Sequence, residues 1–169
     1  MATVQVTRTY LEMSSPADLR DGGEAPRGFV VHRVDPCPPS FFRYLYGEVG
    51  RVHHWTDRLG WDDQRIRDYL TGPVTLWVAY VGGAPAGYFE LKRWEDGSVE
   101  VAYFGLLPEY VGQGWGKALL ARAVREAWEL EPARVWLHTC TLDHPSAMPN
   151  YLKRGFRAFR QETYEAELP

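Results

Sequence analysis

Three glycines at alternate positions stand in the stretch "GQGWGK" (112–117), which leads directly into an apolar run. Glycine at this density lets a backbone turn tightly and lie close against a ligand. If the loop opens a helix, its free N–H groups and the helix dipole attract anions. The stretch therefore predicts a site for a ligand that carries phosphate or another anionic group.

Two familiar phosphate-binding motifs do not fit this loop. The P-loop pattern would need a glycine at Val111 and, at Ala118, a hydroxyl residue that reaches Mg²⁺. The dinucleotide-binding fingerprint would need its third glycine at Lys117 and would follow the first strand of a sheet. A nucleotide-dependent, kinase-like enzyme is nearly excluded on these grounds.

The elements around the loop predict an α/β (α+β) protein in which residues 1–169 form one domain. Its sheet is expected to be mixed and mostly antiparallel, with helices on both faces. Alternating apolar residues predict strands at 3–13 (an edge strand), 29–34, 74–83, 84–94, 99–108, 133–140 and 156–168. Helical spacing predicts helices at 41–52 and 63–70, after the glycine loop, and within 142–154. The strands on either side of the glycine loop and its helix are expected to be parallel.

The stretch "GLLPEYVGQGWGKALL" resembles the coenzyme A loop of the GNAT-type N-acetyltransferases, whose pattern is [QR]-x-x-G-x-[GA]. Gly114 and Gly116 match this pattern. Val111 departs from it at the position where the family has a basic or amide side chain. Because backbone amides make most of the phosphate contacts in such loops, the departure affects the implied pyrophosphate site only slightly.

A second segment, "SAMPNYLKRGF", resembles the same superfamily in its pattern A-x-x-x-Y-x-x-x-G-F. Ala147, Tyr151, Gly155 and Phe156 stand in register with this pattern. The two matches span residues 100–156, about a third of the chain, and the predicted element order agrees with the GNAT fold.

The resemblance implies that acetyl-CoA is the acyl donor. Its pantetheine arm would lie in a gap between the strands that contain 103–107 and 136–140, and Gly105 suits either a bulge that opens this gap or a close backbone approach. The implied cofactor-binding residues are Gly105, Leu106, Leu107, Val111, Gly112, Gln113, Gly114, Trp115, Gly116, Lys117 and His144. Asp143 is interpreted first as a helix cap and second as a site residue.

The resemblance also implies direct attack of a primary amine on the thioester in a ternary complex. Tyr151 stands where the family has the general acid that protonates the leaving thiolate. The general base stays open between Glu100, His138 and Glu90, with Glu100 preferred and His138 second.

The acceptor site is expected in the first half of the chain. The chain would divide into an edge strand and loop (1–28), an acceptor-side half (29–73) and an acetyl-CoA-binding half (74–169). The loop "RVHHWTDRLGW" carries His53 and Asp57 as well as four candidate substrate-binding residues, His54, Trp55, Arg58 and Trp61. Aromatic walls with one acid suit an amine, and Arg58 would suit a carboxylate on the substrate.

No residue in this loop identifies the acceptor, which could be a small molecule or a peptide. Two alternatives to acetyl transfer stay open. One is a non-catalytic protein that senses acyl-CoA, and the other is an acyltransferase that uses a longer acyl-CoA.

The composition argues against several kinds of partner. The net charge is −3 without a basic cluster, so we expect no nucleic-acid partner. No apolar run approaches the roughly 20 residues of a membrane helix, and the start lacks an apolar signal-peptide core, so we expect a cytoplasmic protein without a membrane partner. Cys37 and Cys140 are interpreted as reduced thiols, and no metal is expected. A homodimer is left open.

Overall fold

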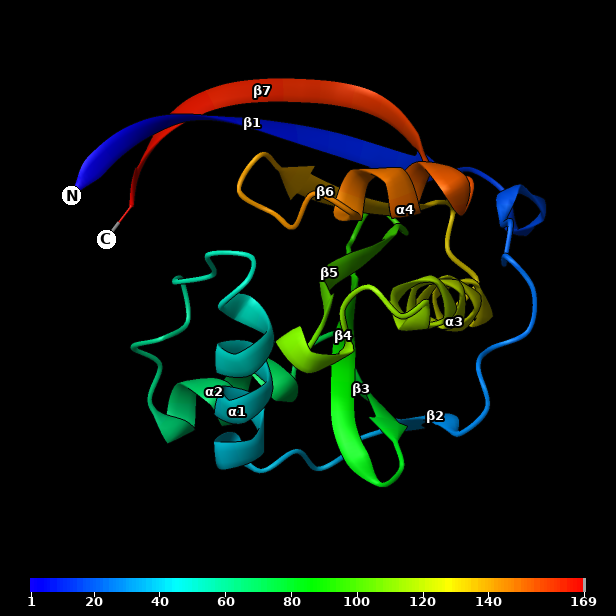
Figure 1. The fold of residues 1–169 in the computed structure, drawn as a ribbon, viewed down its shortest axis with the longest axis horizontal. Helices are drawn as coiled ribbons and strands as arrows, with labels where there is room; N and C mark the ends of the chain where they lie inside the picture. Colours follow the sequence, from blue (N-terminus) through cyan, green and yellow to red (C-terminus); the bar gives the residue numbers. More distant parts are fainter. Residues whose placement is uncertain (169) are drawn as a thin grey trace.

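A seven-stranded sheet in the order β2-β3-β4-β5-β6-β1-β7 forms the centre of the structure, a computed structural model that describes residues 1–168 (Figure 1). Its strands are β1 (Ala2–Met13), β2 (Phe29–Arg33), β3 (Val74–Val81), β4 (Ala84–Arg93), β5 (Val99–Leu106), β6 (Val135–Cys140) and β7 (Arg157–Leu168). Neighbouring strands are antiparallel except β5 and β6, which are parallel. The predicted mixed, mostly antiparallel sheet is confirmed.

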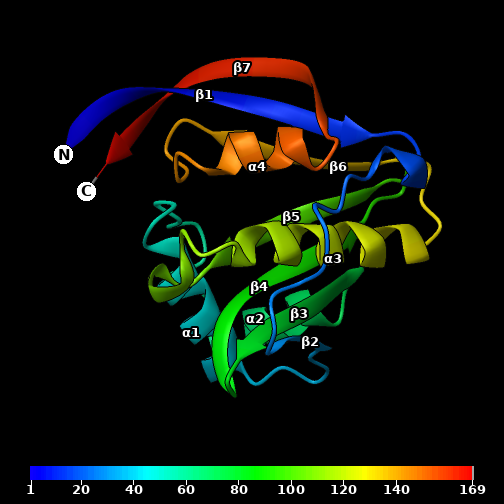
Figure 2. The ribbon, with the colours of Figure 1, turned by 45° about the vertical axis from the view of Figure 1, so that its right-hand side comes forward.

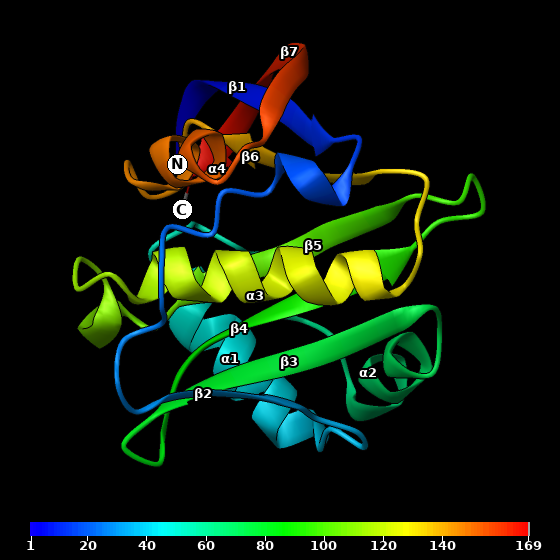
Figure 3. The ribbon, with the colours of Figure 1, turned by 90° about the vertical axis from the view of Figure 1, so that its right-hand side faces the viewer.

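Helices cover both faces of this sheet, as predicted. They are α1 (Pro39–Gly50), α2 (Asp63–Leu70), α3 (Trp115–Glu129) and α4 (Ala147–Lys153), with short 3₁₀ turns at Pro16–Asp18 (η1) and Pro108–Tyr110 (η2). Figure 3 shows α3 on one face and α1 and α2 on the other. Side chains that alternate along β3 serve both layers, because Leu76 and Val78 pack in the α1–α2 core while Trp77 and Ala79 pack in the α3 core.

None of the helices described between residues 1 and 168 combines the length and the apolar character that are needed to cross a bilayer.

The N-terminal strand is not an edge strand, so that prediction is wrong. β1 lies between β6 and β7, and β7 takes the edge because it pairs with β1 from Ala2–Leu168 to Glu12–Arg157. Pairing with β6 covers only Arg8–Met13, so the rest of β1 and β7 runs on as a two-stranded ribbon past β6 (Figure 2). The sequence of β1 alone does not reveal a partner that follows at the far end of the chain.

The parallel strands β5 and β6 part almost at once. They pair only at Val99–Val135 and Glu100–Trp136, after which β5 stays with β4 and β6 stays with β1. A gap therefore opens toward the carboxyl ends of the two strands, where it was predicted.

Gly105 does not form the predicted bulge. The register between β4 and β5 shifts at Ala102, whereas Gly105 pairs regularly with Tyr88. The alternative prediction for Gly105, a close approach to its backbone, is confirmed, because α1 and the turn after it pack against this position. A Cβ atom at this position would lie 2.6 Å from Cγ1 of Val49 and 2.9 Å from Nε2 of His53.

A glycine-ended turn fixes Tyr151 at the end of α4. The N–H of Phe156 donates to the carbonyl of Tyr151 at 3.1 Å, and the N–H of Gly155 donates to that of Leu152 at 3.2 Å, which is the Schellman pattern. Gly155 has φ +105°, and a Cβ there would lie 2.0 Å from the carbonyl oxygen of Asp18. Glycine is therefore required at this position for two reasons, the positive φ angle and the lack of room for a Cβ atom.

Replacing Gly155 by alanine is expected to lower the free energy of unfolding by at least about 3 kcal/mol, because the methyl group must displace backbone as well as adopt a positive φ. Gly83 is the matched control, since it has φ +86° and nothing within 4 Å of an added Cβ. Alanine there should cost only about 1 kcal/mol. Urea unfolding measures both variants, and equal losses would contradict the role of the Asp18 contact.

Candidate active site

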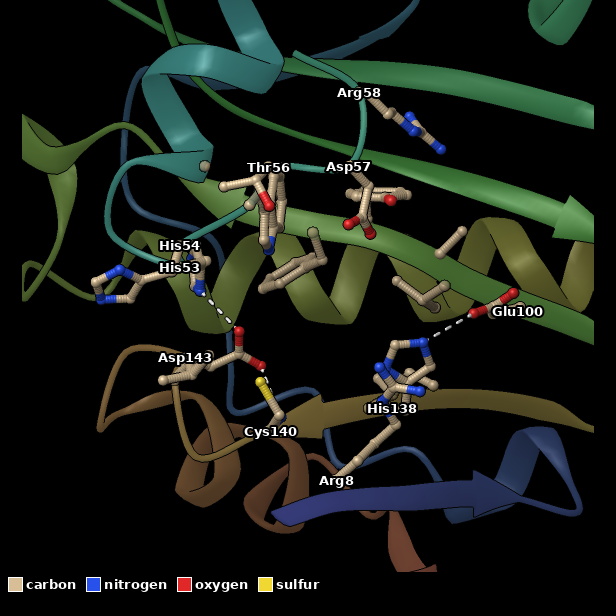
Figure 4. Close-up of a pocket in the computed structure, with 18 of the residues that line it drawn as sticks. Arg8, His53, His54, Thr56, Asp57, Arg58, Glu100, His138, Cys140 and Asp143 are labelled. Atoms are coloured by element: carbon tan, nitrogen blue, oxygen red, sulfur yellow. Dashed lines mark hydrogen bonds and ion pairs between the residues drawn. The ribbon is translucent and has the colours of Figure 1, made fainter. Parts of the chain in front are cut away.

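Two adjoining cavities lie at the gap between β5 and β6. The larger, of about 840 Å³, is a cleft between the loop after α1, β5, β6 and the β1–β7 ribbon (Figure 4). The smaller, of about 200 Å³, is a groove bordered by the end of β5, the glycine loop and α4. His53, Phe104 and Tyr151 line both, so the cavities meet at these three side chains.

The glycine loop forms one wall of the groove. Gly114 is the N-cap residue of α3 with φ +86°, and no side chain caps this end of the helix. The N–H groups of the first turn thus have no side-chain acceptor, and the helix dipole makes this end electropositive. The amide of Asn150 donates to the carbonyl of Gly116 at 3.2 Å and ties α4 to α3 across the groove.

A groove of this form suits an elongated anion, because an uncapped helix start stands at one end and an opened sheet at the other. A match to the model of the acetyltransferase (GNAT) family over residues 36–156 agrees with this geometry. The chain belongs to the GNAT family. The predicted resemblance is confirmed over far more of the chain than the two motifs alone.

Relatives and solved structures agree with this assignment. Uncharacterized N-acetyltransferases of Mycobacterium bovis and Mycobacterium tuberculosis are 33% identical over 101 residues, which cover 59% of this chain and 64% of theirs. The chain thus spans less than two thirds of these relatives. A GCN5-related N-acetyltransferase from Kribbella flavida is 22% identical with a TM-score of 0.68, over 96% of this chain and 58% of that one. One from Sphaerobacter thermophilus is 14% identical with a TM-score of 0.69, over 96% and 51%. These structures show the GNAT fold.

Most of the residues predicted to hold the cofactor line the groove. They are Gly105, Leu106, Val111, Gly112, Gly114, Gly116, Lys117 and His144. Val111, which departs from the GNAT pattern, thus contributes an apolar side chain to the wall. Asn150, Ser146 and Ala147 also line the groove and were not among the predicted residues.

Three predicted cofactor residues point elsewhere. Leu107 is buried in the α1–α2 core, and Trp115 stacks on Phe29 with ring centroids 5.9 Å apart. The amide of Gln113 donates back to the carbonyl of Glu109 at 3.0 Å. Their side chains serve the fold of the loop, which a one-dimensional motif does not separate from ligand contact.

Tyr151, the predicted general acid, is buried at the junction of the two cavities. Burial raises the pKa of its phenol, and the nearby carboxylate of Asp143 adds to this rise. The phenol therefore keeps its proton near neutral pH and has one to donate.

Glu100 and His138 face each other in the larger cleft, with 3.8 Å between Oε2 and Nε2 (Figure 4). Burial raises the pKa of Glu100 against the opposing effect of the Trp94 N–H, which donates to it at 3.1 Å. Burial and then the charge of Arg8 lower the pKa of His138. The two pKa values are thus shifted toward each other.

Glu90 and Arg58 form a buried ion pair, so neither has the predicted role. The guanidinium Nη1 lies 2.7 Å from Oε2 of Glu90, and both side chains are at most 5% exposed. The guanidinium also donates to the Tyr69 hydroxyl and lies 3.7 Å from the centre of the Tyr103 ring. Arg58 borders the cleft, but its charge is already neutralised by Glu90. Its prediction as a partner for a substrate carboxylate is therefore corrected.

The other three residues predicted to bind the acceptor fall into two groups, one in the cleft and one in the core. His54 and Trp55 line the larger cleft. Trp61 instead stacks on Phe42 with ring centroids 6.2 Å apart, and it packs in the α1–α2 core. The loop is thus partly a cleft wall and partly a packed connection.

Asp143 does not cap α4, whose N-cap residue is Ser146. Its carboxylate instead pairs with His53, a contact that the sequence did not predict. Nδ1 of His53 lies 3.5 Å from Oδ1 of Asp143. Burial alone would raise the pKa of Asp143, but hydrogen bonds from His53, Thr139 and the N–H of Cys140 together lower it. The two residues lie far apart in the chain and in different motifs, so no local signal indicates that they meet.

Among residues 1–168, no three His, Cys, Asp or Glu side chains gather as a metal site requires.

Replacing Glu90 by glutamine is expected to lower the free energy of unfolding by about 3–5 kcal/mol, because the buried charge of Arg58 loses its partner. Glu126 is the matched control, since its carboxylate also lies 2.7 Å from an arginine nitrogen but on the surface of α3. Glutamine there should cost at most about 0.5 kcal/mol. Chemical denaturation compares the two variants, and similar losses would contradict a structural role for the pair.

Proposed function

We propose that this protein is an N-acetyltransferase that transfers the acetyl group of acetyl-CoA to the primary amine of a small molecule or peptide, by direct attack in a ternary complex. The observation that carries this proposal is the junction of the two cavities. A groove that begins at an uncapped glycine-loop helix meets a larger cleft at a buried tyrosine.

The groove supports a role in holding the donor. N–H groups at the start of α3 would bind the pyrophosphate, and Lys117 would add positive charge. The pantetheine arm would lie along β5 where β6 has moved away. This path would bring the thioester to Tyr151, beside the cleft that admits the amine.

The reaction needs a proton to leave the ammonium and another to reach the sulfur. The neutral amine attacks the carbonyl carbon of the thioester, and the carbon–sulfur bond of the tetrahedral intermediate breaks. Tyr151 gives its proton to the departing thiolate and regains one from the amide nitrogen as the product forms. The acceptor cleft has aromatic walls around Trp55 and Tyr103, with the carboxylate of Asp57 at its border, which suits a cationic amine.

Replacing Gly114 by aspartate is expected to weaken acetyl-CoA binding at least 100-fold, because a carboxylate would stand at the helix end that holds the pyrophosphate. Gly83→Asp is the control, since both glycines have φ +86° and nothing within 4 Å of an added Cβ. Calorimetric titration with acetyl-CoA measures both. Unchanged affinity in a folded Gly114→Asp protein would contradict the assignment of the loop.

Replacing Tyr151 by phenylalanine is expected to reduce kcat about 100-fold or more while leaving acetyl-CoA affinity unchanged, because only the acid is lost. Tyr44→Phe, on the exposed side of α1, should leave kcat unchanged. Thiol release over a panel of primary amines measures turnover. Acetyl-CoA binding without turnover of any amine would instead favour a sensor, and tighter binding of longer thioesters would favour another acyl donor.

A further inference from the structure

His53 occupies the place where the donor groove and the acceptor cleft meet. It follows α1 and lines both cavities, together with Phe104 and Tyr151. Its imidazole is only 9% exposed and stacks on Trp55 with ring centroids 5.1 Å apart. The Nε2 edge of the ring lies against β5 at Gly105, beyond the point where β6 has parted from it.

Asp143 holds the opposite edge of this ring. Its Oδ2 accepts hydrogen bonds from the hydroxyl of Thr139 and from the N–H of Cys140, the latter at 3.1 Å. Its Oδ1 is turned to Nδ1 of His53 at 3.5 Å (Figure 4). A carboxylate at Nδ1 keeps the proton on that nitrogen and leaves Nε2 as the acceptor.

The geometry points to His53 as the general base of the transfer reaction, with Asp143 as its positioning residue. This inference rests on the proposed function. Nε2 of His53 takes a proton from the ammonium of the acceptor, which leaves a neutral amine with its lone pair free. The amine then attacks the thioester, and the imidazolium, held beside Asp143, later releases its proton to solvent.

Glu100 and His138 are less well placed for this step. Glu100 stands on the last position at which β5 pairs with β6, five residues before Gly105. Five strand residues extend roughly 16 Å. Both side chains line the cleft but not the groove, whereas His53 lines both.

The electrostatic surroundings of His53 come from several elements. The titratable groups that line the two cavities with it include Asp143 and Cys140 on β6 and the turn after it, Tyr151 and His144 on α4 and the preceding turn, Lys117 on α3, and Asp57 on the continuing loop. Among residues 1–168, Asp143 is the carboxylate within ion-pair distance of its ring. The pH dependence of the reaction should therefore respond to Asp143 as well as to His53.

The test compares His53→Gln and Asp143→Asn with wild type across pH, using the primary amine that gives the fastest thiol release. His53→Gln should lose about 100-fold in kcat near pH 7, with acetyl-CoA affinity and KM within about twofold. The loss should shrink above about pH 9, where the amine increasingly deprotonates without help. Asp143→Asn should lose less and shift the ascending limb of the profile. His53→Asn serves as a second variant if glutamine disturbs folding.

His32→Gln is the control, because this exposed histidine lies on β2, outside both cavities. It should behave as wild type. A wild-type profile for His53→Gln would overturn the inference alone, as would a pH-recoverable loss found in Glu100→Gln or His138→Gln instead. Absence of turnover by the wild-type protein would overturn the proposed function and the inference with it.

Discussion

Two parallel strands that stay paired over only two positions determine where this protein can act. β5 and β6 part after Glu100 and Trp136, and each keeps its antiparallel neighbour on the other side. The sheet thus remains whole at one end and divided at the other. The glycine loop that leaves β5 and the helix that follows β6 are carried to opposite sides of this division, so both cavities form there.

A buried charge secures the side of the division that the loop after α1 forms. Arg58 could not be taken out of water without a partner, and Glu90 on the interior strand β4 supplies it. The pair fixes the loop after α1 to the sheet, with aromatic rings packed around the guanidinium. The same loop places His54 and Trp55 in the wall of the cleft. The ion pair of Arg58 therefore stabilises the loop that positions these two side chains.

The sequence predicted the elements well where a local pattern carries the information. Alternation along the strands and the glycines before α3 depend on near neighbours in the chain, and the family motifs are local too. The predictions that failed depend on distant partners. The place of β1 in the sheet is decided by β7, and the role of Arg58 is decided by Glu90. The contact between His53 and Asp143 likewise exists only in the folded chain.

The divided sheet has four strand edges instead of two. β2 and β7 form the outer edges, and the separated parts of β5 and β6 form two inner ones. Unpaired edges can recruit strands from other chains and lead to aggregation. Here the inner edges line the two cavities, between the loop after α1 on one side and α4 on the other. The inner edges therefore place unpaired backbone N–H and C=O groups in a cavity wall, where a bound ligand can pair with them.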